Sequence, residues 1–264
     1  MYNKINIYKT DFSNKYLLRY DDNSLYVGYI VKEVILLLKN KVRENNISEI
    51  INEKYNLNVN DVNITTNSTS WSIGALIGES INTSVINCSS SGFVNASAQF
   101  TGSYVGGLVG DNYGINSNIL NSYSNANVYG NTWVGGLVGE QFKASINSSY
   151  STGNVNGVTG VGGIVGTNDA GFIYNSYSTG NVNRLSGTNV FIGGFCGYNT
   201  GGSIINSYST GNVTYEGASN PTDKGFVGVA IESGIYNDSG NFWDNETSLQ
   251  STTSGNAIGK STLL

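Results

Sequence analysis

The feature that constrains this chain most is a short glycine-framed apolar phrase that recurs at nearly constant spacing. Its copies are "GALIG" at 74–78, "GGLVG" at 106–110 and 135–139, "GGIVG" at 162–166, "GGFCG" at 193–197 and a degenerate "KGFVG" at 224–228. Successive copies are 27 to 32 residues apart. A polar phrase, "NSYSTGNV" at 175–182 and again at 206–213, recurs with the same period. One unit of this length is too short to bury a core alone, so the period predicts stacked repeats.

The composition of the units favours short β-strands over helices. Gly, Asn, Ser and Val are poor helix formers, and no 3.6-residue apolar period is present. Two or three short strands per repeat, joined by Gly/Asn turns, describe one coil of a β-solenoid, with like residues stacked about 4.8 Å apart. We therefore expect a mainly β protein with a β-helix of about six coils of 27–32 residues. The central apolar residues of the phrases are expected to point inward: Leu76, Leu108, Leu137, Ile164, Phe195 and Phe226.

The polar phrase predicts two stacked columns of side chains. One is an amide ladder through Asn121, Asn175 and Asn206. The other is an aromatic column, which makes four tyrosines the candidate ligand-binding residues: Tyr123, Tyr150, Tyr177 and Tyr208. Two interpretations of the aromatic column stay open, packing between coils or a flat platform for sugar rings. Packing is favoured, because a periodic column is needed for folding whatever the protein binds.

Composition excludes several classes of function. The chain has no His, which removes Ser-His-Asp and Cys-His catalysis and HExxH zinc sites. Cys88 and Cys196 form no CxxC pair and are expected to be buried free thiols. The net charge of −5 argues against nucleic acid as a partner. No segment has the length and apolar character of a membrane span or reads as a signal peptide, and no cofactor motif is present.

An acidic column is the one pattern that suggests site chemistry. The residue directly after each apolar phrase is Glu79, Asp111, Glu140, Thr167 and Tyr198 in successive repeats. The three carboxylates could form a solvated corner, a Ca²⁺ site, or a pair of carboxylates acting on a glycosidic bond. The solvated corner is favoured, because the position merely follows the repeat. We expect no enzymatic activity.

The first 66 residues differ from the repeats. They carry a net charge of +1, against −6 for 67–264, which indicates a domain boundary near Thr66. "KYLLRY" at 15–20 and "LYVGYI" at 25–30 predict a hairpin across "DDNS", and apolar patterns predict helices over 30–41 and 46–56. This order weakly resembles the pyrroloquinoline-quinone synthesis protein D family, a small winged-helix-like α+β domain that binds a peptide along its hairpin. The alternative interpretation is a cap that covers the end of the solenoid.

The repeats themselves resemble the GLUG motif, on "VGGLVG…NSYSTGNV". The motif occurs in arrays in bacterial surface proteins, including filamentous-haemagglutinin-type adhesins and IgA-specific metallo-endopeptidases. The segment "NFWDNETSLQSTTSGNAIGKST" at 241–262 resembles the tail that closes such arrays, with Leu249 in place of the expected Gly. The resemblance spans about residues 71–262 and implies a surface or secreted β-solenoid. We therefore expect a cap at 1–66, repeats at 67–240 and a closing tail at 241–264.

These expectations lead to one favoured function and two alternatives. The favoured one is a non-enzymatic, adhesin-like module or spacer on the cell surface or outside the cell, with host glycans or cell-surface proteins as partners. The first alternative is an intracellular, cytoplasmic peptide-recognition protein that acts through residues 1–60 and uses the solenoid as a scaffold. The second is a polysaccharide-active β-helix enzyme that uses the acidic column. The chain is also interpretable as a fragment of a longer surface protein.

Overall fold

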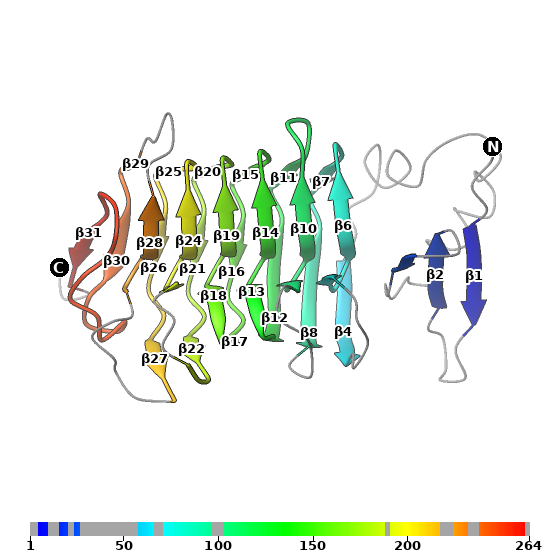
Figure 1. Cartoon of the computed structure of the whole chain (residues 1–264), viewed down its shortest axis with the longest axis horizontal. Coiled ribbons are helices and arrows are strands. Elements are labelled where there is room, and N and C mark those ends of the chain that lie inside the picture. The colour runs from blue at the N-terminus through cyan, green and yellow to red at the C-terminus, as the bar shows by residue number, and fades with distance from the viewer. Residues whose placement is uncertain are drawn as a thin grey trace.

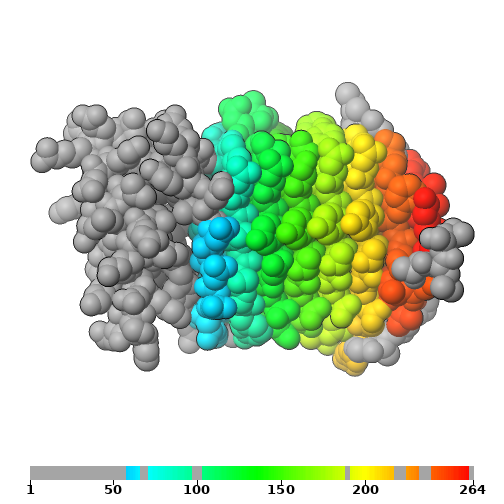
Figure 2. Space-filling view, turned by 180° about the vertical axis from the view of Figure 1, so that it is seen from behind, coloured from blue at the N-terminus to red at the C-terminus, as the bar shows by residue number. Residues whose placement is uncertain are grey.

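The protein forms a parallel β-solenoid, described here from a computed structural model (Figure 1). The described residues are 5–9, 16–20, 24–26, 58–65, 71–96, 103–187, 191–216, 224–231 and 238–261. All the regular elements that these residues form are β-strands. In the solenoid the strands of successive coils pair in parallel, so the coils lie side by side as bands along one axis (Figure 2). The mainly β, solenoid prediction is confirmed.

Each coil passes through four sheets, numbered here in chain order. The first sheet contains β5 (Ser72–Gly74), β9 (Tyr104–Gly106), β13 (Thr132–Gly135), β18 (Thr159–Gly162) and β23 (Ile192–Gly193). The second contains β6 (Ile77–Ile81), β10 (Val109–Tyr113), β14 (Val138–Phe142), β19 (Val165–Asp169), β24 (Cys196–Thr200) and β28 (Val227–Ile231). The third contains β7 (Ser84–Ile86), β11 (Asn118–Leu120), β15 (Ser145–Asn147), β20 (Phe172–Tyr174), β25 (Ser203–Ile205) and β29 (Asp238–Ser239).

The fourth sheet is the longest and holds the polar phrase. It contains β4 (Asn58–Thr65), β8 (Ser89–Asn95), β12 (Tyr123–Tyr129), β16 (Tyr150–Ser151), β17 (Val155–Gly157), β21 (Tyr177–Ser178), β22 (Val182–Arg184), β26 (Tyr208–Ser209), β27 (Val213–Tyr215), β30 (Phe242–Asp244) and β31 (Ile258–Lys260). In later coils the strand is interrupted at the Thr-Gly of the phrase, as between β16 and β17. β4 pairs in parallel with β8, so Asn58–Thr65 belongs to the solenoid, although it precedes the boundary expected near Thr66.

Five coils are complete, because five strands of the first sheet are each followed by strands of the other three. The expected number of about six therefore includes one partial coil. In that coil β28, β29 and β30 are present, but Lys224 of "KGFVG" makes only an isolated bridge to Gly193 in place of a first-sheet strand. The repeat length is confirmed by the register: Val138 pairs with Val165, and Cys196 pairs with Val227.

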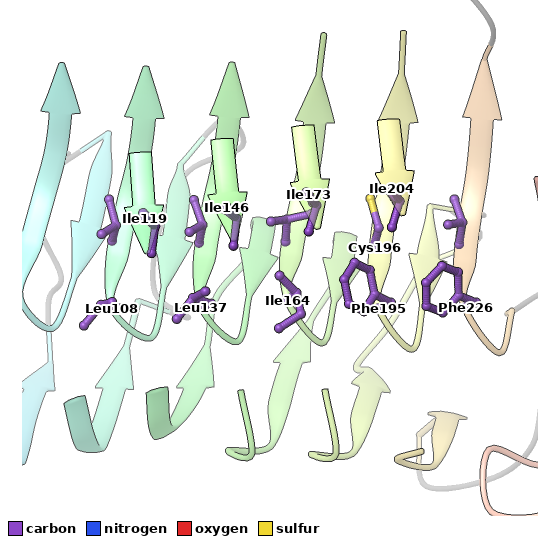
Figure 3. Close-up of a cluster of buried hydrophobic side chains, with 14 of the residues drawn as sticks. Leu108, Ile119, Leu137, Ile146, Ile164, Ile173, Phe195, Cys196, Ile204 and Phe226 are labelled. Carbon is purple, nitrogen blue, oxygen red and sulfur yellow. The ribbon is translucent and has the colours of Figure 1, made fainter. Parts of the chain in front are cut away.

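The apolar residues of the glycine-framed phrases point inward as predicted, with Leu76 only partly buried (Figure 3). Between the second and third sheets they form the first core with the stacked isoleucines Ile119, Ile146, Ile173 and Ile204. The rings of Phe195 and Phe226 stack there with centroids 4.7 Å apart. A second core lies between the first and fourth sheets and is built mainly from valines, such as Val134 and Val155.

A narrow waist separates the two cores and explains why the two phrases recur together. A Cβ added to Gly136 would lie 2.2 Å from the carbonyl oxygen of Gly163 and 2.3 Å from the Oγ of Ser151. No side chain fits at this distance, so Gly136 must stay glycine, whereas the first copy of the phrase has the small Ala75 at this position. The opposing serine of "SYS" reaches the backbone across the waist: Ser178 Oγ donates to the Gly194 carbonyl at 2.7 Å.

The recurring asparagine of the polar phrase occupies a backbone bend, and the amide ladder expected through it is wrong. Asn121, Asn175 and Asn206 are exposed and have φ of 49° to 51°, the left-handed region that Asn tolerates better than most residues. They form the bend between the third and fourth sheets. A buried amide ladder exists elsewhere, directly after the acidic column, and comprises Asn112, Gln141, Asn168 and Asn199.

The C-terminal segment covers the end of the stack. Trp243 on β30 is 7% exposed, and its indole Nε1 donates to the Gln250 carbonyl at 3.0 Å. The Gln250 Nε2 in turn donates to the Val213 carbonyl of the last full coil at 2.9 Å. The tail thus supplies hydrogen-bond partners to strands that would otherwise present an open edge. Cys88 and Cys196 are buried free thiols, as predicted.

The N-terminal part is described only by its strands. β1 (Ile5–Lys9), β2 (Tyr16–Tyr20) and β3 (Ser24–Tyr26) form an antiparallel sheet, in which β2 and β3 pair across the expected turn. The helices predicted over 30–41 and 46–56 lie outside the described residues, so the winged-helix-like interpretation gains no support. Within the described ranges, no helix is long and apolar enough to cross a membrane.

Candidate functional site

The four candidate tyrosines form one continuous stack on the outer face of the fourth sheet. Successive rings are 4.7, 4.8 and 5.0 Å apart between centroids, and their planes are within 4° of parallel. The strand register sets this order, because Tyr123, Tyr150, Tyr177 and Tyr208 pair directly with one another. Tyr208 is the most exposed, at 41%. Burial, with a neighbouring phenol, raises the pKa of both Tyr150 and Tyr208.

The stacking decides which part of each ring a ligand can reach. The faces of Tyr150 and Tyr177 are covered by their neighbours, since each lies between two parallel rings. Stacking on a sugar ring uses the face of the aromatic ring. Along the side of the column, a ligand would therefore meet ring edges and phenol hydroxyls, while ring faces become available only toward the ends of the column.

Uncharged polar side chains flank the tyrosines and extend the same face. Thr152 Oγ1 donates to Asn125 Oδ1 at 2.7 Å in the preceding coil. Further along the phrase, the Oδ1 of Asn154 accepts the backbone N–H of Asn181, and the Oδ1 of Asn181 accepts that of Asn212, both at 3.0 Å. The result is a regular surface of hydroxyl and amide groups with one set per coil.

The three carboxylates of the acidic column also stack, on the second sheet. Asp111 pairs with Glu79 of the preceding coil and with Glu140 of the next. Asp111 is only 6% exposed, whereas Glu79 and Glu140 are half-buried. Burial and the two neighbouring carboxylates, Glu140 and then Glu79, raise the pKa of Asp111 to about 7. The column is thus less hydrated than the solvated corner that was favoured from the sequence.

Tyr104 of the first sheet faces this column. Its phenol forms a hydrogen bond with the Glu140 carboxylate, and burial followed by that carboxylate raises the pKa of Tyr104. Burial also raises the pKa of Glu140, while the hydrogen bond from Tyr104 opposes the rise. The outer faces of the first and second sheets therefore meet where the apolar phrase bends the chain, and they bring an aromatic and an acidic column together.

Sequence reasoning missed the aromatic half of this junction. Trp133 stands in the coil after Tyr104, and its ring contacts Phe191 and Tyr198, with centroids 6.3 and 6.0 Å away. The signal was present, because an aromatic residue precedes the apolar phrase in "YVGGLVG", "WVGGLVG" and "FIGGFCG".

The acidic column does not bring together enough ligands for a metal ion. In the part of the chain that the structure describes, no group of three or more His, Cys, Asp or Glu side chains is placed to hold one. Calcium prefers six to eight oxygen ligands, whereas Glu140 already accepts the Tyr104 phenol. The geometry offers carboxylates spaced one per coil, which suits a longer polar ligand better than a single metal ion.

Comparison with known proteins identifies one motif. Residues 192–214 match the family described as the GLUG motif. They include the first-sheet strand β23, the phrase "GGFCG" and the whole of the second "NSYSTGNV". No curated protein and no solved structure matches the chain. Residues 192–214 are thus a GLUG motif, built into the fifth complete coil of a β-solenoid whose other coils carry the same phrases.

Proposed function

We propose that this protein is a surface or secreted repeat module, which acts as an adhesin-like binding rod or as a spacer. The observation that carries the proposal is the Tyr123–Tyr208 column, stacked without interruption over four coils on a face of uncharged polar groups. A uniform face of this kind can contact an extended ligand at many equivalent points. The GLUG motif at 192–214 supports the surface role, since the repeats of this chain resemble the arrays of that motif in bacterial surface proteins.

Glycans and cell-surface proteins are the partners that we propose. The tyrosine edges, threonine hydroxyls and asparagine amides are neutral donors and acceptors, which match the hydroxyl groups of a sugar chain. Many weak contacts repeated along the axis would act together, because binding at one coil raises the effective concentration at the next. The proposal includes no catalytic step and no cofactor.

Localisation is the first experiment for this proposal. Intact source cells are treated with protease, and the protein is then detected in the cells and in the culture medium. We expect loss of the protein from intact cells, or its presence in the medium. Complete protection until the cells are lysed would contradict the surface role and direct attention to residues 1–60, where the peptide-recognition alternative lies.

Glycan binding is tested on an array with two matched variants. The double variant Tyr150→Phe/Tyr177→Phe keeps both rings in the stack but removes two hydroxyls, so a ligand held by phenol edges should bind more weakly. Thr179→Ala changes an exposed side chain of the same face and separates the contribution of the tyrosines from that of the surface as a whole. Binding that both variants leave unchanged would argue against the tyrosine column as the contact surface.

A further inference from the structure

Asp111 is a buried carboxylate that lies between two other carboxylates. It is 6% exposed, and its Oδ1 has no hydrogen-bond partner among the described residues. Glu79 and Glu140 flank it in register on β6 and β14. A buried carboxylate that is neither paired nor fully hydrogen-bonded is costly to keep charged, so the arrangement calls for a proton or a cation.

The solenoid does not supply that cation itself. The described part of the solenoid contains four basic residues, and each is engaged away from Asp111. Three lie over aromatic rings and one donates to a threonine hydroxyl: Lys143 on Phe142, Arg184 on Tyr215, Lys260 on Phe242, and Lys224 on Thr252. Among the described residues, the charges that act on Asp111 are those of Glu140 and Glu79. Within the described part of the solenoid, this column therefore has no positive partner.

Trp133 is a strained aromatic side chain of the first sheet, and its ring lies toward Phe191 and Tyr198 of a later coil. It follows Tyr104 in the outward column of the first sheet and has a φ of 47°. The equivalent residue of the next coil is Gly160, with a φ of 62°, and the indole lies over it. A left-handed conformation is costly for a bulky residue, and such strain concentrates at functional sites.

We propose that the junction of Glu79, Asp111 and Glu140 with Tyr104 binds the primary ammonium group of an alkylamine, such as a lysine side chain. Carboxylates of neighbouring coils are about 4.8 Å apart in such a ladder. If an ammonium nitrogen lies about 2.8 Å from each of two oxygens at that separation, the O···N···O angle is about 118°. This is near the angle between two of its own N–H bonds. The methylene chain would lie along the ring of Tyr104, since aromatic rings attract cations at their faces.

The same spacing disfavours calcium. With Ca–O distances of about 2.4 Å, two oxygens about 4.8 Å apart would sit on opposite sides of the ion and leave most of its coordination positions without a ligand. An ammonium group needs only three acceptors, and the column with the Tyr104 oxygen provides them. The ligand is therefore assigned to organic cations.

The test is isothermal titration calorimetry of the full chain at pH 8 with three probes. They are n-butylammonium chloride, the blocked peptide acetyl-Gly-Lys-Gly-amide and its norleucine analogue. We expect both cations to bind and the norleucine peptide not to bind. Asp111→Asn should weaken binding about ten-fold or more, since it removes a charged hydrogen bond, whereas Glu246→Gln in the exposed tail removes the same charge with little effect.

Each outcome bears on the proposal. Binding of the peptide without binding of butylammonium would assign the site to lysine presented by a polypeptide, and equal binding would assign it to free alkylamines. No heat with either cation, equal affinity in Asp111→Asn, or displacement of the amine by equimolar CaCl₂ would overturn it. If Asp111→Asn does not fold by circular dichroism, Glu140→Gln takes its place, with the same expected loss.

Discussion

The phenol rings of Tyr150 and Tyr177 lie face to face across consecutive coils, with centroids 4.8 Å apart and planes 4° from parallel. Tyr208 stacks on the other face of Tyr177 at 5.0 Å. Tyr177 is therefore held between two rings, and its side chain contributes to the stability of the coil stack whether or not it also contacts a ligand.

Replacing Tyr177 by alanine should destabilise the solenoid. Two aromatic contacts are lost, each worth about 0.5–1.5 kcal/mol beyond buried area, so the free energy of unfolding should fall by about 1–3 kcal/mol. Urea denaturation followed by circular dichroism measures the change. Tyr177→Phe keeps the stack and should remain within about 0.5 kcal/mol of the wild type. Equal stability of all three proteins would show that the column does not stabilise the fold.

Stability should depend on pH through Asp111. Its pKa is raised from 3.8 to about 7, so the folded protein holds a proton that the unfolded chain releases. The free energy of unfolding should therefore be highest below pH 4 and fall as the pH rises to about 7, by on the order of 2–4 kcal/mol. The groups that face Asp111 are Glu79, Glu140 and Tyr104, and none of them is positively charged.

Asp111→Asn tests this pH dependence. Denaturation midpoints are measured between pH 4 and pH 8 for the wild type, for Asp111→Asn and for the exposed-site variant Glu246→Gln. The asparagine variant should lose most of the slope and keep the smaller part due to Glu140, whose pKa is also raised. Glu246→Gln should keep the wild-type slope. A slope that survives in Asp111→Asn would place the titrating group elsewhere.

The buried amide ladder should be more sensitive to mutation than the exposed asparagines. Asn168 accepts a hydrogen bond from Gln141 Nε2 at 3.2 Å and donates to Asn199 Oδ1 at 2.8 Å. Asn168→Ala leaves a buried amide group on each side without its partner, which should cost about 2–4 kcal/mol of unfolding free energy. The control is Asn125→Ala on the exposed fourth sheet, where water replaces the lost contact and the cost should be below about 1 kcal/mol. Similar losses at both sites would contradict the ladder's role.

Trp243 should protect the C-terminal end of the stack. Trp243→Ala removes a buried ring and the hydrogen bond from its indole to the Gln250 carbonyl. The free energy of unfolding should therefore fall by about 3–5 kcal/mol. Exposed strand edges pair with other chains, so the variant should also self-associate, as measured by sedimentation velocity. Trp71→Ala makes the same chemical change at a side chain that is 72% exposed and should leave both properties nearly unchanged. A monomeric, stable Trp243→Ala protein would show that the tail does not cap the stack.

The sequence by itself determined which residues stack on one another. Identical phrases at a regular period must come into register in a solenoid, because each strand pairs with its copy in the next coil. The inward positions of Leu108 and Phe195, and the alignment of Tyr150 with Tyr177, follow from that alone. So does the alignment of Asp111 with Glu140.

Only the tertiary structure decided how the chain bends within one coil. The period relates a residue to its copies, and it carries no information on which columns face each other around the coil. The bends set those contacts: the left-handed conformation of Asn121, the waist at Gly136, and the turn that brings Tyr104 to Glu140. The site at the aromatic and acidic columns therefore could not be assembled from the period, since its two halves meet only because the glycine-framed phrase folds the first sheet against the second.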